Sequence, residues 1–320
     1  MNIVCATDDN FVQHCSIMLV SLLSNNEDVH IYILTEGLKE QNKTIIEEEV
    51  NRLGGELHFC LVDSSIVEKF PMPDRDDLTH ISRATYYRLL LADLLPENVH
   101  KVIYLDCDMI VNSDLSDLWN VEFGSNALAA VLQIGSGFEA ERLGYPIKYG
   151  YFNAGMNVLN IDYFRKNKTS SELVLFLNQN YSRILYHDQD ALNSVLYDKT
   201  IHLMPQWNMM AFSYVFQLSK RCDHENGKVV NNYKAEKLNV KQYKKKPCII
   251  HYTAKPKPWQ EGCIHPLANY YYKYARLTLH YSNIKKPSNF KRYYAIVEHR
   301  VFEYLSAIKQ RFVRSDKTRY

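Results

Sequence analysis

Short apolar runs alternate with amphipathic helical patterns through the first 135 residues of the chain. Runs that predict strands cover residues 3–7, 29–34, 56–62, 101–105 and 127–132, and patterns that predict helices cover residues 14–23, 39–53 and 83–95. This alternation predicts an α/β fold with a mainly parallel, mixed sheet flanked by helices on both faces. In such a fold, ligands bind beyond the carboxyl ends of the strands. Polar residues that follow a strand are therefore the first candidates for a site.

The second half of the chain is less regular. Its patterns predict a strand at residues 154–161, helices at 163–180 and 189–196, an exposed polar loop at 220–246 and a last strand at 248–252. Beyond Pro266 the chain is rich in Tyr, Lys and Arg, with 12 basic against 3 acidic side chains over residues 267–320. We therefore expect an α/β domain over residues 1–265 and a basic, aromatic helical tail over residues 266–320.

Composition narrows the class of protein. With 320 residues and 46% hydrophobic side chains, the chain can bury a substantial core. The sequence starts without a basic stretch followed by an apolar one, and no window approaches 18 uncharged apolar residues. Its seven cysteines show no CxxC spacing, which favours free thiols in a reducing compartment. Together these features predict a cytoplasmic protein.

Two aspartates, Asp106 and Asp108, follow the apolar run KVIYL within the stretch KVIYLDCDMIV. Residues i and i+2 of an extended chain point to the same side, so both carboxylates are expected to face one point. Paired oxygen ligands suit Mg²⁺ or Mn²⁺, and either ion can bridge diphosphate oxygens. Asp-x-Asp alone is a weak signal, because it occurs three times in this chain of 18 Asp. A pair of turn or helix-cap aspartates is the alternative.

His251 stands at the end of the last predicted strand, in CIIHYTAKPKPW. It is a candidate third metal ligand, and the alternative is a packed core histidine. Lys255 and Lys257 follow it in a proline-punctuated loop. These two lysines are candidates for a fixed cationic clamp on phosphate.

Six blocks of sequence occur in an order that resembles glycosyltransferase family 8. They are ATDDN at 6–10, HISRATYYRL at 80–89, YLDCDMIV at 104–111, YFNAGMNVLNID at 151–162, HDQDALN at 187–193 and HYTAKPKPW at 251–259. The likeness is to bacterial lipopolysaccharide and lipooligosaccharide α-galactosyl- and α-glucosyltransferases, and it spans about residues 1–265. It implies a GT-A-like nucleotide-binding fold and a retaining transfer of galactose or glucose from a UDP-sugar to a saccharide acceptor, such as a lipopolysaccharide core.

The resemblance also implies residue roles. Asp106, Asp108 and His251 would bind Mn²⁺, with Mg²⁺ as the alternative. Gln189 and Asp188 would act at the sugar, Gln189 on the β face of its anomeric carbon and Asp188 on its hydroxyls. The residues implied in donor binding are Ala6, Asp8, Asn10, Arg88, Asp106, Cys107, Asp108, Asn153, Ala154, Asp188, Gln189, Ala254 and Lys257.

Within that set, Asp8 and Asn10 would contact the uracil and the ribose, and Lys257 would neutralise the β-phosphate. Three other roles have a plainer alternative. Arg88 could be a surface helix charge, Asn153 could belong to an ordinary turn, and Asp188 could be a helix N-cap.

Two positions depart from the family pattern. Ala254 stands where the family usually has Gly, and its methyl group could crowd the approach of the backbone to phosphate. Gln133 stands where relatives often have Asp near the acceptor. That difference leaves the acceptor open and does not affect the expected reaction.

The expected chemistry is a front-side attack. UDP leaves readily only when its developing negative charge is stabilised, which a divalent cation and Lys257 would do. The sequence offers no evident carboxylate pair of the kind that retaining glycosidases use, and the neutral amide of Gln189 is a poor nucleophile. The acceptor hydroxyl would therefore enter on the leaving-group side and pass its proton to the departing phosphate oxygen. The carbonyl dipole of Gln189 would support the oxocarbenium-like state.

Apolar residues recur every three or four positions from Phe290 to Phe312, and Lys and Arg flank that face. A basic amphipathic helix of this kind can lie on an anionic membrane surface. The alternative is a helix packed on the catalytic domain. A lipid-linked acceptor at the inner face of the cell membrane would suit peripheral membrane attachment.

Other functions fit the sequence less well. GSGFEA at 135–140 formally matches a dinucleotide fingerprint, but the helix after it is too short for a crossover, because Tyr145-Pro146 follows Gly144. Two alternatives stay open, a transferase that acts on another glycan or on protein, and a non-catalytic nucleotide-sugar-binding module. No nucleic-acid-binding motif is present, so we expect no nucleic-acid partner.

Overall fold

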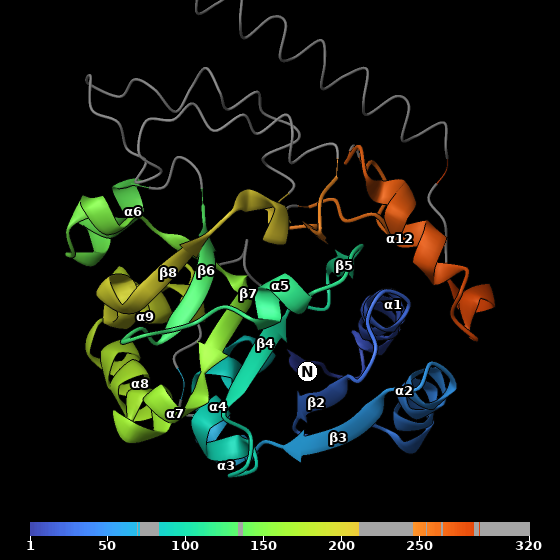
Figure 1. Cartoon of the computed structure of the whole chain (residues 1–320), viewed down its shortest axis with the longest axis horizontal. Helices are drawn as coiled ribbons and strands as arrows, with labels where there is room; N and C mark the ends of the chain where they lie inside the picture. The colour runs from blue at the N-terminus through green and yellow to red at the C-terminus, as the bar shows by residue number, and fades with distance from the viewer. Residues whose placement is uncertain are drawn as a thin grey trace, which may run out of the picture.

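A seven-stranded sheet in the order β3-β2-β1-β4-β7-β6-β8 forms the centre of the molecule (Figure 1). The computed structural model describes residues 1–68, 70, 83–133, 137–210, 246–253, 255–263, 265–284 and 288. The strands of this sheet are β1 (Asn2–Ala6), β2 (His30–Thr35), β3 (Glu56–Leu61), β4 (Lys101–Leu105), β6 (Leu128–Leu132), β7 (Phe152–Asn160) and β8 (Thr200–Leu203). β7 is antiparallel to both of its neighbours, and the other pairs in the sheet are parallel.

Helices cover both faces of the sheet, because alternate strand residues are buried on opposite sides. Ile3, Ile31 and Ile103 pack against α1, α2 and α5. On the other face, Val4 and Tyr104 belong to a core that includes residues of α4, α7, α8 and α9. These helices are α1 (Val12–Leu23), α2 (Glu40–Arg52), α4 (Leu91–Leu94), α5 (Ser116–Trp119), α7 (Ile161–Lys166), α8 (Thr169–Gln179) and α9 (His187–Leu196). The predicted α/β class, with a mainly parallel mixed sheet between helices, is confirmed.

Two predicted helices differ in detail. The helix expected at residues 83–95 is the 3₁₀ helix η2 (Arg83–Leu90) followed by the single α-helical turn of α4. The helix expected at residues 163–180 is divided into α7 and α8, because Lys168 adopts a left-handed backbone with φ of 53°. A right-handed helix cannot continue through such a residue. The helix α6 (Gly137–Leu143) begins within the GSGFEA stretch and is short, as the sequence indicated.

The order of the strands places a crevice beyond β1 and β4. β1 pairs with β2 on one side and with β4 on the other, so the order of the strands along the chain reverses between β1 and β4. This reversal of strand order is where open α/β sheets bind ligands. Polar residues follow both strands at this edge, Asp8 after β1 and Asp106 after β4.

A second, three-stranded sheet lies beside this edge. It consists of β5 (Met109–Val111), β10 (Ile249–His251) and β9 (Met209–Met210), with β10 in the middle. β10 is antiparallel to β5, in a register that puts His251 opposite Met109. Long-range pairing therefore brings His251 next to Asp108, although the two are far apart in the sequence.

Residues beyond 265 pack on the body as far as they are described. α12 (Ala268–Ala275) buries Tyr271, Tyr272 and Tyr274 in a cluster with Ile17 and Ile110. The predicted tail helix from Phe290 and nearly all of the predicted loop at 220–246 lie outside the described residues, and the domain boundary after residue 265 stays a prediction. In the described part of the chain, none of the helices is long and apolar enough to cross a membrane.

Candidate active site

The Asp-Cys-Asp segment forms a turn that joins the two sheets. Asp106, Cys107 and Asp108 lie between the end of β4 and the start of β5. The Asp106 N–H donates to Gly155 O at 2.8 Å, and Asp108 O accepts from Tyr252 N at 3.0 Å. The two carboxylates converge as the sequence predicted, but the cause is this anchored turn. The expected i, i+2 alternation within one extended strand is wrong.

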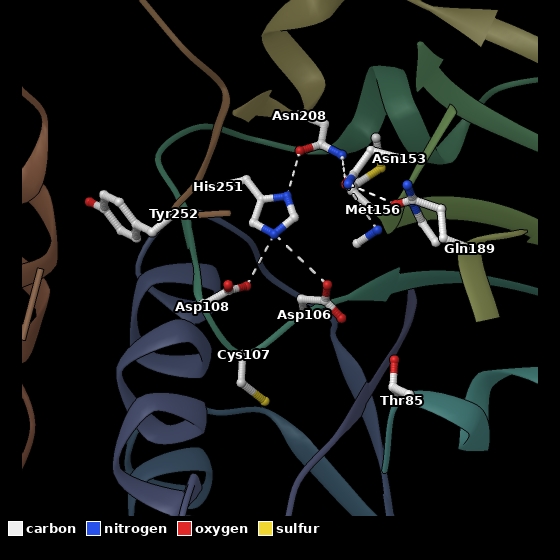
Figure 2. A network of polar contacts seen from close by, with 12 residues as sticks. Thr85, Asp106, Cys107, Asp108, Asn153, Met156, Gln189, Asn208, His251 and Tyr252 are labelled. Atoms are coloured by element: carbon white, nitrogen blue, oxygen red, sulfur yellow. Dashed lines mark hydrogen bonds and ion pairs between the residues drawn. The ribbon is translucent and has the colours of Figure 1, made fainter. Parts of the chain in front are cut away.

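His251 faces both carboxylates (Figure 2). Its Nε2 lies 3.8 Å from Asp106 Oδ2 and 3.2 Å from Asp108 Oδ1. This approach depends on Gly155 in β7, because a Cβ atom there would lie 2.3 Å from His251 Cε1 and 2.6 Å from Asp106 Oδ2. Any larger residue at position 155 would fill the space between the imidazole and the carboxylates.

Lys257 adds positive charge at the same corner. Its Nζ lies 2.6 Å from Asp108 Oδ2 and also donates to Tyr252 O. Burial alone would raise the pKa of Asp108, but the Lys257 ammonium and His251 hold that pKa well below its usual range. Burial raises the pKa of Asp106. Lys255, the other lysine predicted for a phosphate clamp, is exposed.

The residues at this corner fit a divalent cation. One ligand atom from each of Asp106, Asp108 and His251 lies within 4.8 Å of the other two. Asp108 Oδ1 is buried, yet it accepts no hydrogen bond from the described part of the chain. A buried acceptor without a hydrogen bond is costly unless positive charge compensates it. Two carboxylates and an imidazole form a ligand set that suits Mn²⁺, so this cluster could hold such an ion.

Arg88 is buried beneath the carboxylates and is not a surface helix charge. Its Nη2 donates to Asp106 Oδ1 at 2.7 Å, its Nε lies 2.8 Å from Asp188 Oδ2, and its Nη1 donates to Ala154 O at 2.5 Å. The guanidinium also stacks 4.2 Å from the centre of the Tyr104 ring. Burial alone would lower the pKa of Arg88, but Asp106 and Asp188 raise it above its usual range. Arg88 therefore locks three segments of the site together.

A pocket of about 190 Å³ opens beside Arg88 and the Asp-Cys-Asp turn. Of the predicted donor-binding residues it is lined by Ala6, Asp8, Arg88, Asp106, Cys107 and Asp108, and it also contains Thr7, Phe11, Ala84, Thr85 and Tyr104. Phe11 is 38% exposed, and no motif in the sequence predicts that it belongs to the site. Asn10 lines a neighbouring pocket against α1 and α2 instead. Ala254 lies outside the described residues.

A chain of polar side chains runs from His251 to Gln189 (Figure 2). His251 Nδ1 lies 2.9 Å from Asn208 Oδ1, Asn208 Nδ2 donates to Asn153 Oδ1 at 2.8 Å, and Asn153 Nδ2 donates to Gln189 Oε1 at 3.0 Å. Sequence reasoning missed Asn208, a lone asparagine in QWNMM with no motif around it. Asn153 is 8% exposed and serves this chain, in addition to any contact with a sugar.

The amide of Gln189 is held from two sides. Its Oε1 accepts from the backbone N–H of Ala154 at 2.9 Å as well as from Asn153, and its Nε2 lies 3.4 Å from Gln133 Oε1. A carbonyl oxygen has two lone pairs, and both are used here. The carbonyl dipole that sequence reasoning assigned to the sugar therefore points into the protein, and the amide nitrogen faces Gln133 and the hydroxyl of Tyr151.

Asp188 lies within the first turn of α9 and is not its N-cap, which is Tyr186. Asp188 Oδ1 accepts from Thr85 Oγ1 at 2.6 Å, and Oδ2 pairs with Arg88 at 2.8 Å. Burial raises the pKa of Asp188, against the opposing effects of Arg88 and Thr85. The carboxylate connects α9 to η2 at the floor of the site. Its predicted contact with sugar hydroxyls stays a prediction.

The arrangement of the strands and helices is that of the GT-A fold, and solved structures of glycosyltransferases have the same fold. Galactosyltransferase LgtC, determined in complex with donor and acceptor sugar analogues, superposes with a TM-score of 0.73 at 24% identity, over 87% of this chain and 96% of LgtC.

The sequence comparisons define the family. The glycosyl transferase family 8 profile matches residues 2–263. General stress protein A of Bacillus subtilis is 31% identical over 287 residues, which cover 87% of this chain and 94% of that protein. The lipopolysaccharide 1,3-galactosyltransferase of Salmonella typhimurium is 25% identical over 279 residues, which cover 84% of this chain and 76% of the enzyme. The chain belongs to glycosyltransferase family 8.

Proposed function

We propose that this protein is a retaining, metal-dependent hexosyltransferase that moves galactose or glucose from a UDP-sugar to a saccharide acceptor. The observation that carries the proposal is the convergence of Asp106, Asp108 and His251 around a buried carboxylate oxygen that accepts no hydrogen bond from the described residues. Lys257 lies at the same corner, and the pocket beyond β1 and β4 adjoins it. A cation site next to such a pocket suits a substrate with a diphosphate.

Each end of the donor has residues of matching chemistry. Asp106, Asp108 and His251 would hold Mn²⁺, or Mg²⁺ in its place, and the bound ion would supply Lewis-acid stabilisation of the leaving diphosphate. Lys257 would turn its ammonium from Asp108 toward the β-phosphate. At the nucleoside end, Phe11 offers an aromatic surface for the base, and Asp8 offers a carboxylate. The contacts proposed for Asn10 and Ala254 rest on the family resemblance alone.

Retention is proposed from the family resemblance, and the state of the carboxylates near Gln189 bears on which retaining mechanism applies. Asp188 is engaged by Thr85 and Arg88, and Asp190 by Arg142 and Tyr151. A carboxylate that accepts several hydrogen bonds in a buried position is a weak nucleophile, so a covalent sugar intermediate is disfavoured. We therefore favour front-side attack, in which the acceptor hydroxyl bonds to the anomeric carbon as the bond to the phosphate oxygen breaks. The hydroxyl proton passes to that departing oxygen, and the Gln189 amide would turn an N–H group from Gln133 toward a sugar hydroxyl.

The acceptor is proposed to be the saccharide core of a lipopolysaccharide or lipooligosaccharide. The support is the similarity to the Salmonella lipopolysaccharide 1,3-galactosyltransferase. Gln133, 3.4 Å from the Gln189 amide, lies where it could contact an acceptor hydroxyl. Another glycan or a protein acceptor is the alternative outcome of an acceptor screen.

The test is release of UDP from UDP-galactose and from UDP-glucose, each with and without Mn²⁺. Metal-dependent release from one of the two supports the transferase and identifies the hexose. Binding of the UDP-sugar without release would replace the proposal with a non-catalytic nucleotide-sugar-binding module. Mass analysis of candidate saccharides after incubation with the preferred donor would then identify the acceptor.

We also propose that the protein works in the cytoplasm, at the inner face of the cell membrane. This proposal rests on the basic amphipathic pattern from Phe290 to Phe312. Deleting the residues after Pro287 should release the protein from anionic lipid vesicles and leave UDP release intact. Unchanged vesicle binding by the shortened protein would contradict the membrane role.

A further inference from the structure

Two backbone N–H groups of β7 fix the direction of the chain of polar side chains between His251 and Gln189. Gly155 N donates to Asn153 Oδ1 at 3.1 Å, and Ala154 N donates to Gln189 Oε1 at 2.9 Å. A peptide N–H can only donate, so each of these contacts requires an oxygen at the side-chain position it faces. The orientations of both amides are therefore determined by the backbone and are not interchangeable.

This direction passes from Asn153 to Asn208 and on to His251. Because Asn153 Oδ1 is an acceptor, the atom of Asn208 that lies 2.8 Å from it must be the donor Nδ2. The oxygen of Asn208 then faces His251 Nδ1 at 2.9 Å. An amide oxygen accepts, so Nδ1 must carry a hydrogen. In the neutral ring, Nε2 is consequently the nitrogen with the free lone pair.

Without Asn208 the ring would favour the opposite arrangement. Nε2 faces the carboxylates of Asp106 and Asp108, and His251 is only 3% exposed. A hydrogen on Nε2 could be donated to Asp108 Oδ1, 3.2 Å away, whereas a lone pair directed at two carboxylates is unfavourable unless a cation lies between them. A doubly protonated ring would also keep its Nδ1 hydrogen on Asn208. In the neutral and in the doubly protonated ring alike, Nδ1 is occupied by Asn208, so Nε2 is the nitrogen that can bind a cation.

We propose that Asn208 is a positioning residue that holds His251 with hydrogen on Nδ1 and Nε2 directed at the cation site, and that Asn153 extends the same constraint to the amide of Gln189. The inference deepens the proposed function, because His251 and Gln189 belong to the same site. It assigns a role to a residue that contacts neither the cation nor the donor. Metal-bound histidines generally donate their second ring N–H to a polar partner that fixes the ring, and Asn208 is that partner here.

Three substitutions of Asn208 separate its hydrogen bond with His251 from its hydrogen bond with Asn153. Asn208→Ala removes both of its hydrogen bonds, and Asn208→Ser, whose shorter side chain cannot reach both partners, replaces it if the alanine variant does not fold. Asn208→Asp keeps an acceptor for His251 but has no N–H for Asn153. The matched control is Asn26→Ala, since Asn26 is 5% exposed, accepts from Leu115 N and donates to Leu22 O.

The first readout is the ¹⁵N NMR spectrum of the His251 ring in metal-free protein, at a pH that leaves the ring neutral, with the signal assigned from His251→Gln. We expect hydrogen on Nδ1 in the wild type and in Asn208→Asp, and a shift of hydrogen to Nε2 in Asn208→Ala. The second is Mn²⁺ affinity from electron paramagnetic resonance, which should fall roughly 10- to 100-fold in Asn208→Ala. Asn208→Asp should keep Mn²⁺ affinity while binding the UDP-sugar less tightly relative to UDP, and Asn26→Ala should change none of these.

The inference would be overturned if Asn208→Ala kept both the ring protonation and the Mn²⁺ affinity of the wild type. It would also be overturned if Asn26→Ala lost as much Mn²⁺ affinity as Asn208→Ala. Its failure is distinct from failure of the proposed function. If the wild type releases no UDP but the ring hydrogen still moves in Asn208→Ala, the positioning role holds and the transferase does not. If the wild type releases UDP in a metal-dependent way but the ring hydrogen stays on Nδ1 in Asn208→Ala, the transferase holds and the positioning role does not.

Discussion

Two Asp-x-Asp pairs of the same chain lie in different surroundings. Asp106 and Asp108 lie on a turn, where both carboxylates face His251. Asp188 and Asp190 lie on α9, where residues two apart point to different sides of the helix. Asp188 pairs with Arg88, and Asp190 accepts hydrogen bonds from Arg142, Tyr151 and the backbone N–H groups of Leu185 and Tyr186.

The pairs differ in whether their buried carboxylate oxygens accept hydrogen bonds. Asp190 is fully buried and has donors on both of its oxygens, so nothing further is needed to keep its charge in the core. Asp108 Oδ1 accepts no hydrogen bond from the described residues. Spacing in the sequence is the same in both pairs, so the unmet acceptor distinguishes a ligand site from a structural ion pair.

The largest expected effect is the loss of catalysis in Asp108→Asn. This change removes one ligand charge from the cluster that would stabilise the leaving diphosphate, so UDP release should fall at least about 10³-fold. The measurement is the initial rate of Mn²⁺-dependent UDP release from the preferred UDP-hexose. A rate above a tenth of the wild type would remove Asp108 from the site and break the contrast between the pairs.

The second pair should show its effect in stability. Asp190→Asn leaves Arg142 with a weaker partner and puts an N–H group among donors, so the free energy of unfolding should fall by about 3–5 kcal/mol. Asp106→Asn should cost far less, because burial raises the pKa of Asp106 and the folded chain therefore holds that charge at a cost. Urea denaturation of both variants tests this ordering. Equal losses of unfolding free energy in the two variants would mean that the hydrogen bonding of the carboxylates does not distinguish the pairs.

A smaller effect is expected for Lys257→Met. The Lys257 ammonium lies 2.6 Å from Asp108 Oδ2, and we expect it to contact phosphate in the complex. Losing one charge-assisted contact of about 1.4 kcal/mol should weaken UDP affinity about tenfold. Lys255→Met is the matched control, since Lys255 lies in the same loop and is exposed. Isothermal titration calorimetry with UDP in the presence of Mn²⁺ compares the two variants. Equal UDP affinities would mean that Lys257 does not contact the phosphate.

The last effect, comparable in size to that of Lys257→Met, concerns pH. Burial lowers the pKa of His14 from 6.5 to about 4, and its ring stacks 3.8 Å from that of Trp259, near Lys257. Below pH 6.5 the unfolded chain binds a proton at His14 that the folded chain does not. Stability is therefore present above that pH and is lost as pH falls toward 4, by about 1–2 kcal/mol between pH 7 and 5.

His14→Gln should flatten this pH dependence in urea denaturation. Hydrogen exchange at pH 5 should speed up in residues 255–263, beside the first Asp pair, and not in α9, which holds the second. Equal acceleration in both segments would show that the acid effect is not local to His14.

The sequence predicted what depends on local pattern. The strands, the helices on both faces and the polar ends of β1 and β4 follow from alternation of apolar residues, and His251 follows from its place at the end of a strand. The burial of Arg88 did not follow, because its partners Asp106 and Asp188 come from other segments. Asn208 and Phe11 carry no motif, and only the pairing of β9 with β10 and the path after β1 give them neighbours in the site.

The most direct test of the proposed cation site is a Mn²⁺ titration followed by electron paramagnetic resonance, with and without UDP. We predict that one Mn²⁺ binds per wild-type chain, more tightly when UDP is present. Asp190→Asn should behave in the same way, and Asp108→Asn and His251→Ala should lose binding. Unaltered Mn²⁺ binding by His251→Ala, or no binding by the wild type even with UDP, would contradict it.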